Sequence, residues 1–252
     1  MNYTNLSFKT AAILTSLAFT SCAAPTQTNK GNTDVVENLV SNINGNGTSF
    51  EFSFKKGPSF NHPTFVVWLE DTAGNFVQTL FVTKSFGTGT FAHGEKSGSK
   101  WKPGQVSRPA ALPYWSHKAG LKKGIAQYVP DSTNAVPDAY TGATPKGSFA
   151  LQTKGDRNYL DKMKILFEIN QTWDWNLYWT NTKYPDDMEY NTSCQPAVVY
   201  AATIDMHNIG KPVQLTPIGR SSHNGSDGKL YTDLNTLTTA LEIAQSITMT
   251  LK

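Results

Sequence analysis

Three phenylalanines alternate with polar residues near the start of the chain, and this pattern restricts the fold more than any other. Phe50, Phe52 and Phe54 would share one face of an extended segment, and the residues between them would face the other side. A repeat of two residues is typical of a β-strand buried on one face. Residues 247–251 show the same alternation. We therefore expect both segments as strands with their apolar residues inward.

Other short apolar segments are separated by turn-forming residues. We expect further strands at residues 65–69, 76–82, 148–152, 163–169, 197–204 and 213–218. The residues DTAGN at 71–75 indicate a β-hairpin between two of them. Strands do not alternate regularly with helices, which argues against a doubly wound α/β sheet. We predict an all-β, mainly antiparallel β-sandwich, Ig-like in general architecture, with long irregular loops.

Helices are expected to be few. Asp233 can cap one C-terminal helix. Its apolar face would be formed at spacings of three, four and three by Leu234, Leu237, Leu241 and Ala244. We expect single helical turns at 35–40 and 113–118, and an ordered loop at 84–100, which is rich in Gly, Ser and Thr.

The first residues look like a secretory signal. One Lys precedes an apolar run at 11–19, which is shorter than the ~20 residues needed to span a bilayer. The residues AFTS before Cys22 resemble a bacterial lipobox, which implies cleavage before Cys22 and acylation of its thiol. The alternative is a secreted protein cut at another position. If Cys22 carries lipid, Cys194 has no internal disulfide partner, and we expect it to be buried.

These features give an expected organisation of signal peptide 1–21, lipidated tether 22–44 and one sandwich domain 45–252. The protein would be an extracytoplasmic lipoprotein of the bacterial cell envelope, held at the membrane by its lipid anchor. Its net charge is only +3 and basic residues are scattered. We therefore expect no nucleic-acid partner.

Common catalytic motifs do not occur in the sequence. G-x-S-x-G, H-E-x-x-H and C-x-x-C are missing, and the five histidines are scattered singly. We therefore expect no catalytic residues and no metal ligands, and a carrier or binding protein rather than an enzyme. The acidic residues at 186–189 are expected to form a solvated loop, with a Ca²⁺ site as the alternative.

Residues 138–144 read DAYTGAT. They resemble the D-x-x-[S/T]-G-A-T signature of proteins that receive FMN covalently from an FAD:protein FMN transferase. The resemblance implies that FMN is esterified to the hydroxyl of Thr144. The other residues that it implies in cofactor attachment are Asp138, Thr141, Gly142 and Ala143.

The residue types suit this chemistry. Gly142 and Ala143 would leave space beside the acceptor hydroxyl, and Pro145 biases Thr144 towards an extended conformation. The alternative is a plain surface turn.

A wider resemblance covers roughly residues 50–205. HPTFVVWLED at 62–71, together with Trp101, Tyr114, Trp115 and the 138–144 segment, is similar to a family of predicted periplasmic proteins named domain of unknown function 2271. The resemblance implies an extracytoplasmic location. It also implies an association with flavin transferases and membrane redox proteins as partners.

Residues 173–179, WDWNLYW, hold three Trp and one Tyr. Aromatic faces there can sandwich a flavin ring or a sugar, with Trp175 as the expected contact and Asp174 and Asn176 as polar partners. The alternative is a hydrophobic cluster that fastens a long loop to the sandwich.

Three functions fit these observations. The first is a lipid-anchored redox protein with FMN on Thr144. The second is a non-catalytic β-sandwich module that binds a glycan, a peptide or a membrane redox partner. The third is a structural envelope lipoprotein.

Overall fold

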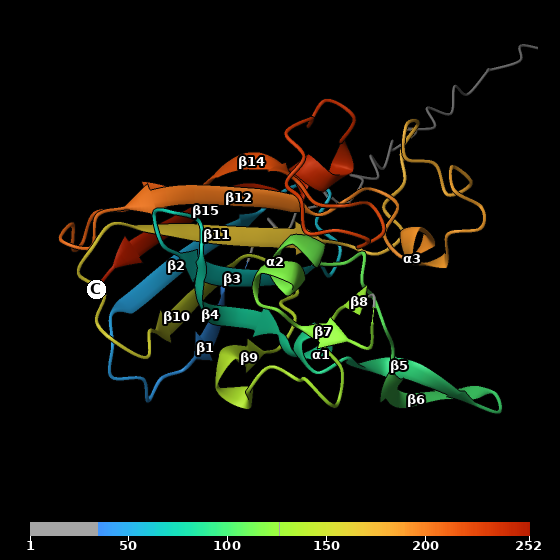
Figure 1. The fold of residues 1–252 in the computed structure, drawn as a ribbon, viewed down its shortest axis with the longest axis horizontal. Helices are drawn as coiled ribbons and strands as arrows, with labels where there is room; N and C mark the ends of the chain where they lie inside the picture. The colour runs from blue at the N-terminus through green and yellow to red at the C-terminus, as the bar shows by residue number, and fades with distance from the viewer. Residues whose placement is uncertain (1–34, 126) are drawn as a thin grey trace, which may run out of the picture. The chain divides into compact units, whose positions relative to one another are not determined.

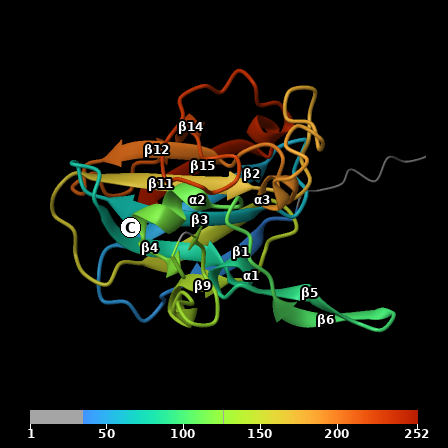
Figure 2. The same ribbon diagram turned by 45° about the vertical axis from the view of Figure 1, so that its right-hand side comes forward.

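Two β-sheets form the body of the protein (Figures 1 and 2). The computed structural model describes residues 35–125 and 127–252. The five-stranded sheet has the order β1 (Glu37–Ser41), β10 (Phe149–Lys154), β2 (Ser49–Lys56), β15 (Ala244–Leu251), β13 (Val213–Gln214). The six-stranded sheet has the order β14 (Thr216–Arg220), β12 (Val198–Ile204), β11 (Met163–Asn170), β3 (Thr64–Glu70), β4 (Phe76–Thr83), β9 (Thr141–Gly142).

The pairing of these strands is mainly antiparallel. Two pairs are parallel, β1 with β10 and β4 with β9. The predicted hairpin joins β3 and β4, with backbone hydrogen bonds across the turn from Asp71 to Asn75. The all-β sandwich predicted from the sequence is confirmed.

Smaller elements surround the two sheets. They are α1 (Lys84–Gly87), β5 (Thr90–Ser97), β6 (Lys100–Gln105), α2 (Pro113–Lys118), β7 (Lys122–Lys123), β8 (Gln127–Tyr128), η1 (Asp138–Tyr140), α3 (Met188–Asn191) and η2 (Thr239–Glu242). No helix in the described ranges has the length and apolar character needed to cross a bilayer.

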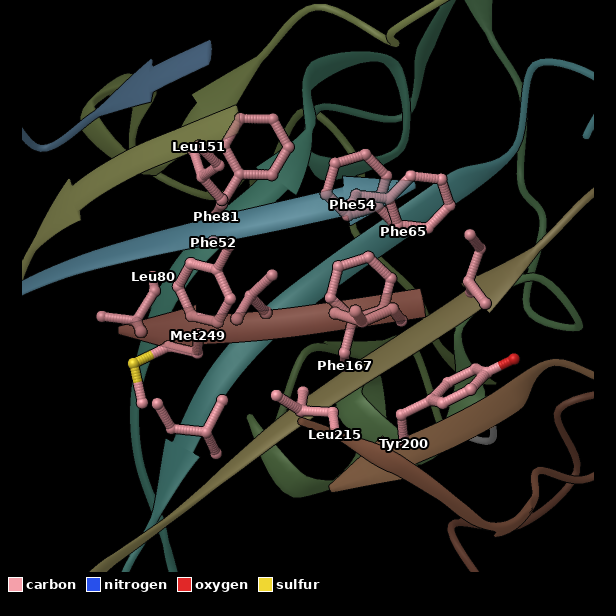
Figure 3. Packing of buried hydrophobic residues seen from close by; sticks show 14 of the residues in the cluster. Phe52, Phe54, Phe65, Leu80, Phe81, Leu151, Phe167, Tyr200, Leu215 and Met249 are labelled. Carbon is pink, nitrogen blue, oxygen red and sulfur yellow. The ribbon is translucent and has the colours of Figure 1, made fainter. Parts of the chain in front are cut away.

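The two sheets enclose a core of phenyl rings, part of which Figure 3 shows. Phe50, Phe52 and Phe54 of β2 all lie inward and are fully buried, as the alternation predicts. Phe65 lies between Phe149 of one sheet and Phe167 of the other, with ring centroids 4.9 and 5.0 Å away. Stacked aromatic pairs contribute about 0.5–1.5 kcal/mol beyond their buried area. This aromatic stack holds the sheets together.

The six-stranded sheet is also covered on its outer face. Val66 and Trp68 of β3 point away from the phenyl core, and they pack with Trp115 of α2 in a second apolar cluster. This explains why the sequence FVVWL at 65–69 is continuously apolar, since each of its residues is buried on one face or the other.

Two glutamate side chains are buried beneath α2. Glu168 accepts hydrogen bonds from the backbone N–H groups of Tyr114 (3.1 Å) and Trp115 (2.8 Å), and burial raises its pKa to about 8. Glu70 accepts from the indole N–H of Trp68 at 3.1 Å and lies 3.5 Å from the ammonium of Lys118. These contacts fix α2 to the outer face of the sheet.

The sandwich starts earlier than expected. A helical turn was expected at residues 35–40. Instead, the strand β1 begins at Glu37, within the expected tether 22–44. Leu39 is inward while Val40 is exposed, and β1 pairs along β10 from Glu37 to Ser41. Pairing with a sheet edge satisfies the backbone of this short segment, which a single helical turn would not. The signal peptide 1–21 and Cys22 lie outside the described residues.

The segment 84–100 was expected to be an ordered loop. It contains α1 and β5 instead. β5 and β6 form a hairpin that projects from the body (Figures 1 and 2). Ser97 pairs with Lys100, which leaves Gly98 and Ser99 as the turn. Gly98 has φ +62°, and a glycine with positive φ at this position favours a two-residue hairpin turn.

The C-terminal helix is shorter than expected and is reduced to the 3₁₀ turn η2. The deeply buried residues of this segment are Leu237, Ala240 and Ile243. Their spacing of three suits 3₁₀ geometry better than the predicted spacings of three, four and three. Ala244, expected in the helix, begins β15 instead.

The expected strand at 213–218 is divided between the two sheets. β13 ends at Gln214 in one sheet and β14 begins at Thr216 in the other, so only Leu215 lies between them. Leu215 is buried and donates its N–H to the carbonyl of Ile247 at 2.9 Å. At the other side of the sandwich, the hydroxyls of Ser41 and Thr153 both donate to the carbonyl of Leu80, at 2.8 and 3.1 Å.

Candidate functional site

The segment 138–144 begins with η1 and continues into β9, an edge strand of the six-stranded sheet. Thr141 pairs with Val82 of β4 and Gly142 with Thr83. This short pairing leaves Ala143 and Thr144 beyond the end of the strand. Ala143 and Thr144 therefore directly follow two residues that are hydrogen-bonded to the sheet.

Hydrogen bonds hold the first half of this segment. The carboxylate of Asp138 lies 2.6 Å from the ammonium of Lys84 in α1, and the hydroxyl of Thr141 donates to Asp138 at 3.2 Å. The hydrogen bonds from Lys84 and then Thr141 keep the pKa of Asp138 below its usual range. Neither Asp138 nor Thr141 lines the groove described below. Asp138 and Thr141 contact each other within the turn.

Gly142 is required by a close approach. A Cβ atom at this position would lie 2.4 Å from the ring of Phe81, so any larger residue would displace the phenyl core or the segment. Its absent side chain therefore makes room for Phe81 as well as for the turn. Ala143, the next residue, is exposed.

Thr144 is half-buried and lies at a groove. Within the part of the chain that the structure describes, its hydroxyl has no hydrogen-bond partner. Pro145 directly behind it is buried. Thr144 thus lies at the wall of the groove, next to a buried proline.

The groove lies where β3 begins and β11 ends. Its volume is about 770 Å³, within the range of roughly 300–1,000 Å³ that is usual for ligand pockets. Phe91 at the base of the β5–β6 hairpin and Trp173 contribute its aromatic surface. Trp173 is 69% exposed. Sequence positions more than 100 residues apart meet at this groove.

Backbone strain is concentrated at the groove. Trp173 has φ +59° and His62 has φ +48°, and both line it. They are two of the four non-glycine residues with positive φ in residues 35–125 and 127–252. Such conformations cost free energy and recur at binding sites.

One cation in the groove has no counter-charge. The guanidinium of Arg108 lies 5.2 Å from the ring centroid of Phe91 and forms no ion pair with any described carboxylate. Burial lowers its pKa, although Arg remains protonated in proteins. The only other titratable side chains that line the groove are His62 and His93. Among the residues that the structure describes, none that lines the groove is acidic, and this lining favours an anion.

The aromatic segment 173–179 divides into a buried and an exposed part. Trp179 is buried and belongs to the core, as the packing alternative expects. Trp175 is 53% exposed but does not line the groove that holds Thr144, so Trp173 takes the place expected for Trp175.

The two expected polar partners of a ligand in this segment have structural contacts. Asp174 accepts from the hydroxyl of Thr239. The side-chain oxygen of Asn176 accepts from the backbone N–H groups of Tyr178 and Trp179, at 2.9 and 2.7 Å. These hydrogen bonds hold the conformation of the loop. Of the residues 173–179, only Trp173 lines the groove.

Three other sequence candidates lie elsewhere. Trp115 is fully buried and donates its indole N–H to Thr79 at 3.0 Å. Cys194 is a buried free thiol, as predicted, and burial raises its pKa. In the acidic loop, Asp187 caps α3 by accepting from the N–H of Tyr190 at 3.0 Å. Within the described ranges, no group of three or more His, Cys, Asp or Glu residues is arranged to hold a metal ion.

Sequence reasoning missed Arg108. It stands alone between Ser107 and Pro109, and no spacing relates it to residues 138–144. Comparison of the chain with protein-family models, with curated proteins and with solved structures gave no match.

Proposed function

We propose that the protein is a lipid-anchored, extracytoplasmic redox protein that carries FMN covalently on Thr144. One observation carries the proposal: the free hydroxyl of Thr144 lies at a groove that also contains an exposed indole and an unpaired guanidinium. These are the three kinds of group that a phosphorylated aromatic cofactor requires. The lipid anchor at Cys22 is part of the proposal and rests on the sequence.

The residues present fit this cofactor. The groove offers aromatic surface for a flat ring from Trp173 and Phe91, and none of its described lining residues has a carboxylate that would repel a phosphate. Asp138 pairs with Lys84 at the start of the turn, and the buried Pro145 follows Thr144 directly. When bound, FMN supplies one- and two-electron transfer; the protein sets its exposure and its electrostatic surroundings.

The attachment step balances without a redox change. The Thr144 oxygen forms an ester bond to the phosphorus of the FMN half of FAD, and the bond from that phosphorus to the AMP half breaks. AMP leaves with the electron pair, and the hydroxyl proton passes to solvent. An FAD:protein FMN transferase catalyses this step, and membrane redox proteins are the proposed electron-transfer partners.

Co-expression with such a transferase tests the proposal. The intact mass should increase by FMN minus one water, and the yellow colour should survive denaturation. Thr144→Ala should abolish the adduct, whereas Thr172→Ala, which removes another hydroxyl from the same groove, should leave it unchanged. Thr141→Ala should lower the yield because it weakens the brace at Asp138. An unmodified wild-type mass in the presence of an active transferase would refute the proposal.

A second function is supported by a different observation. Besides Trp173, the side chains of Trp175, Leu177 and Tyr178 are exposed on the same loop. Exposed aromatic side chains are typical of surfaces that bind glycans or proteins. A non-catalytic binding module is therefore the alternative if Thr144 is not modified.

A further inference from the structure

Arg108 differs from the other two arginines of the chain. Arg220 is paired with Asp233 at 2.9 Å, and Arg157 is exposed to water. Arg108 is half-buried, rests on Phe91 and has no carboxylate partner in the described ranges. Withdrawing a cation from water without a counter-charge is unfavourable. An anion in the groove would remove this cost.

The surroundings of Arg108 restrict the anion. Hydroxyl side chains line the groove, among them Thr64 and Ser85, and its wall is aromatic at Trp173. Hydroxyl donors and a guanidinium together suit phosphate oxygens, which Arg binds through two parallel hydrogen bonds. An indole suits a flat ring. Together they suit a phosphate attached to an aromatic system.

We propose that Arg108 forms a non-covalent phosphate site in this groove, so that the unmodified protein binds FMN and prefers it to riboflavin. The identity of the ring rests on the function proposed above, whereas the phosphate site rests on Arg108 and on the lack of acidic residues in the described lining of the groove. After esterification to Thr144 the phosphodiester retains one negative charge, and Arg108 offsets it. Arg108 is thus a binding residue both before and after attachment.

The test compares two probes that differ only in the phosphate. The full chain, produced without a transferase, is titrated with FMN and with riboflavin by calorimetry. We expect FMN to bind about tenfold more tightly, as one charge-assisted contact would give. The preference should weaken as salt increases, and inorganic phosphate should compete with FMN but not with riboflavin.

Variants then assign the preference to one side chain. Arg108→Gln should bind FMN and riboflavin equally, while Arg108→Lys, which retains the charge, should keep part of the preference. Arg157→Gln is the matched control, because it removes the same charge from over another ring, that of Tyr159, and should change nothing. Thermal unfolding of each variant confirms that it is folded.

The outcomes separate this inference from the proposed function. Equal affinity of the wild type for the two probes, no binding of either probe, or an FMN preference that survives in Arg108→Gln would overturn the phosphate site. The Thr144→Ala variant should retain the preference for FMN, since the site is non-covalent. If the transferase leaves Thr144 unmodified while the preference depends on Arg108, covalent attachment fails and the phosphate site stands.

Discussion

The two faces of the six-stranded sheet are built by the same strands but differ in chemistry. On the inner face, Phe65 of β3 and Phe167 of β11 belong to a dry stack of rings. On the outer face, the same strands present Trp68 and Glu168 to α2. The phenyl rings of the inner face are stabilised by packing alone. The buried polar groups of Trp68 and Glu168 on the outer face also need hydrogen-bond partners.

This difference explains where a ligand can bind. The inner face is closed by the second sheet, and the aromatic groups there already pack against each other. The outer face is covered by short segments only, and at the end where β3 begins its covering opens into the groove. Glu168 finds its partners in the backbone of α2, while Arg108 finds none among the described carboxylates. Polar groups that can bind a ligand are therefore left on the outer face of the six-stranded sheet, at the groove.

The largest expected effect separates the inner face from the groove. Phe65→Ala should lower the free energy of unfolding by about 3–5 kcal/mol, because it removes a ring from the middle of the stack. Trp173→Ala, at an exposed position, should change it by less than about 0.5 kcal/mol. Denaturant titration measures both. If Phe65→Ala cannot be purified, Phe65→Leu should show a smaller loss; equal stabilities for the phenylalanine and tryptophan variants would invalidate the comparison.

A smaller effect is expected where the acceptor segment meets the core. Gly142→Ala places a methyl group against the ring of Phe81 and should cost about 1–3 kcal/mol through overpacking. It should also lower the yield of the FMN adduct, since the segment must shift. Ala143→Ser, at the neighbouring exposed position, is the control and should leave stability unchanged. A fully stable Gly142→Ala protein would show that the approach to Phe81 is not tight.

The outer face should respond to pH through Glu168. Its pKa of about 8 in the folded protein exceeds the ordinary value of 4.5, so the folded state holds a proton that the unfolded chain releases between these values. Stability is therefore fully present below pH 4.5 and falls as the pH rises to about 8, by on the order of 1 kcal/mol per pH unit.

Substitution tests the source of this slope. Glu168→Gln should be less stable at low pH, because one backbone N–H loses its acceptor, but its stability should not decline across the same interval. Glu95→Gln in the exposed β5–β6 hairpin should keep the wild-type slope. Persistence of the slope in Glu168→Gln would assign it to another group.

Much of the fold follows from local patterns. Alternation predicts β2 and β15 with the correct inward residues, and the continuous run at 65–69 predicts β3. The hairpin β5–β6 was missed because its side chains are exposed on both faces, so the segment has no apolar period, although Gly98 and Ser99 signal a turn.

The candidate site was predictable only in part. The motif at 138–144 led to Thr144 as the proposed acceptor, but the groove combines segments around residues 62, 91, 108 and 173. No sequence spacing encodes their proximity, because it arises from the pairing of β3 with β11 and from the position of the hairpin. For the same reason the sequence indicated Trp175 where the structure places Trp173.

The two sides of the sandwich are closed by different means. At Leu215 a single residue carries the chain from one sheet to the other. On the Leu80 side the link is the longer segment 143–148 between β9 and β10, and two hydroxyl hydrogen bonds join the sheets. Such hydrogen bonds are each worth about 1 kcal/mol, but the backbone at Leu215 cannot part. We therefore expect transient opening of the sandwich to begin beside Leu80 with Leu215 as the hinge, so that amide hydrogens of the edge strand β1 should exchange with solvent sooner than those of β13, the edge strand beside Leu215.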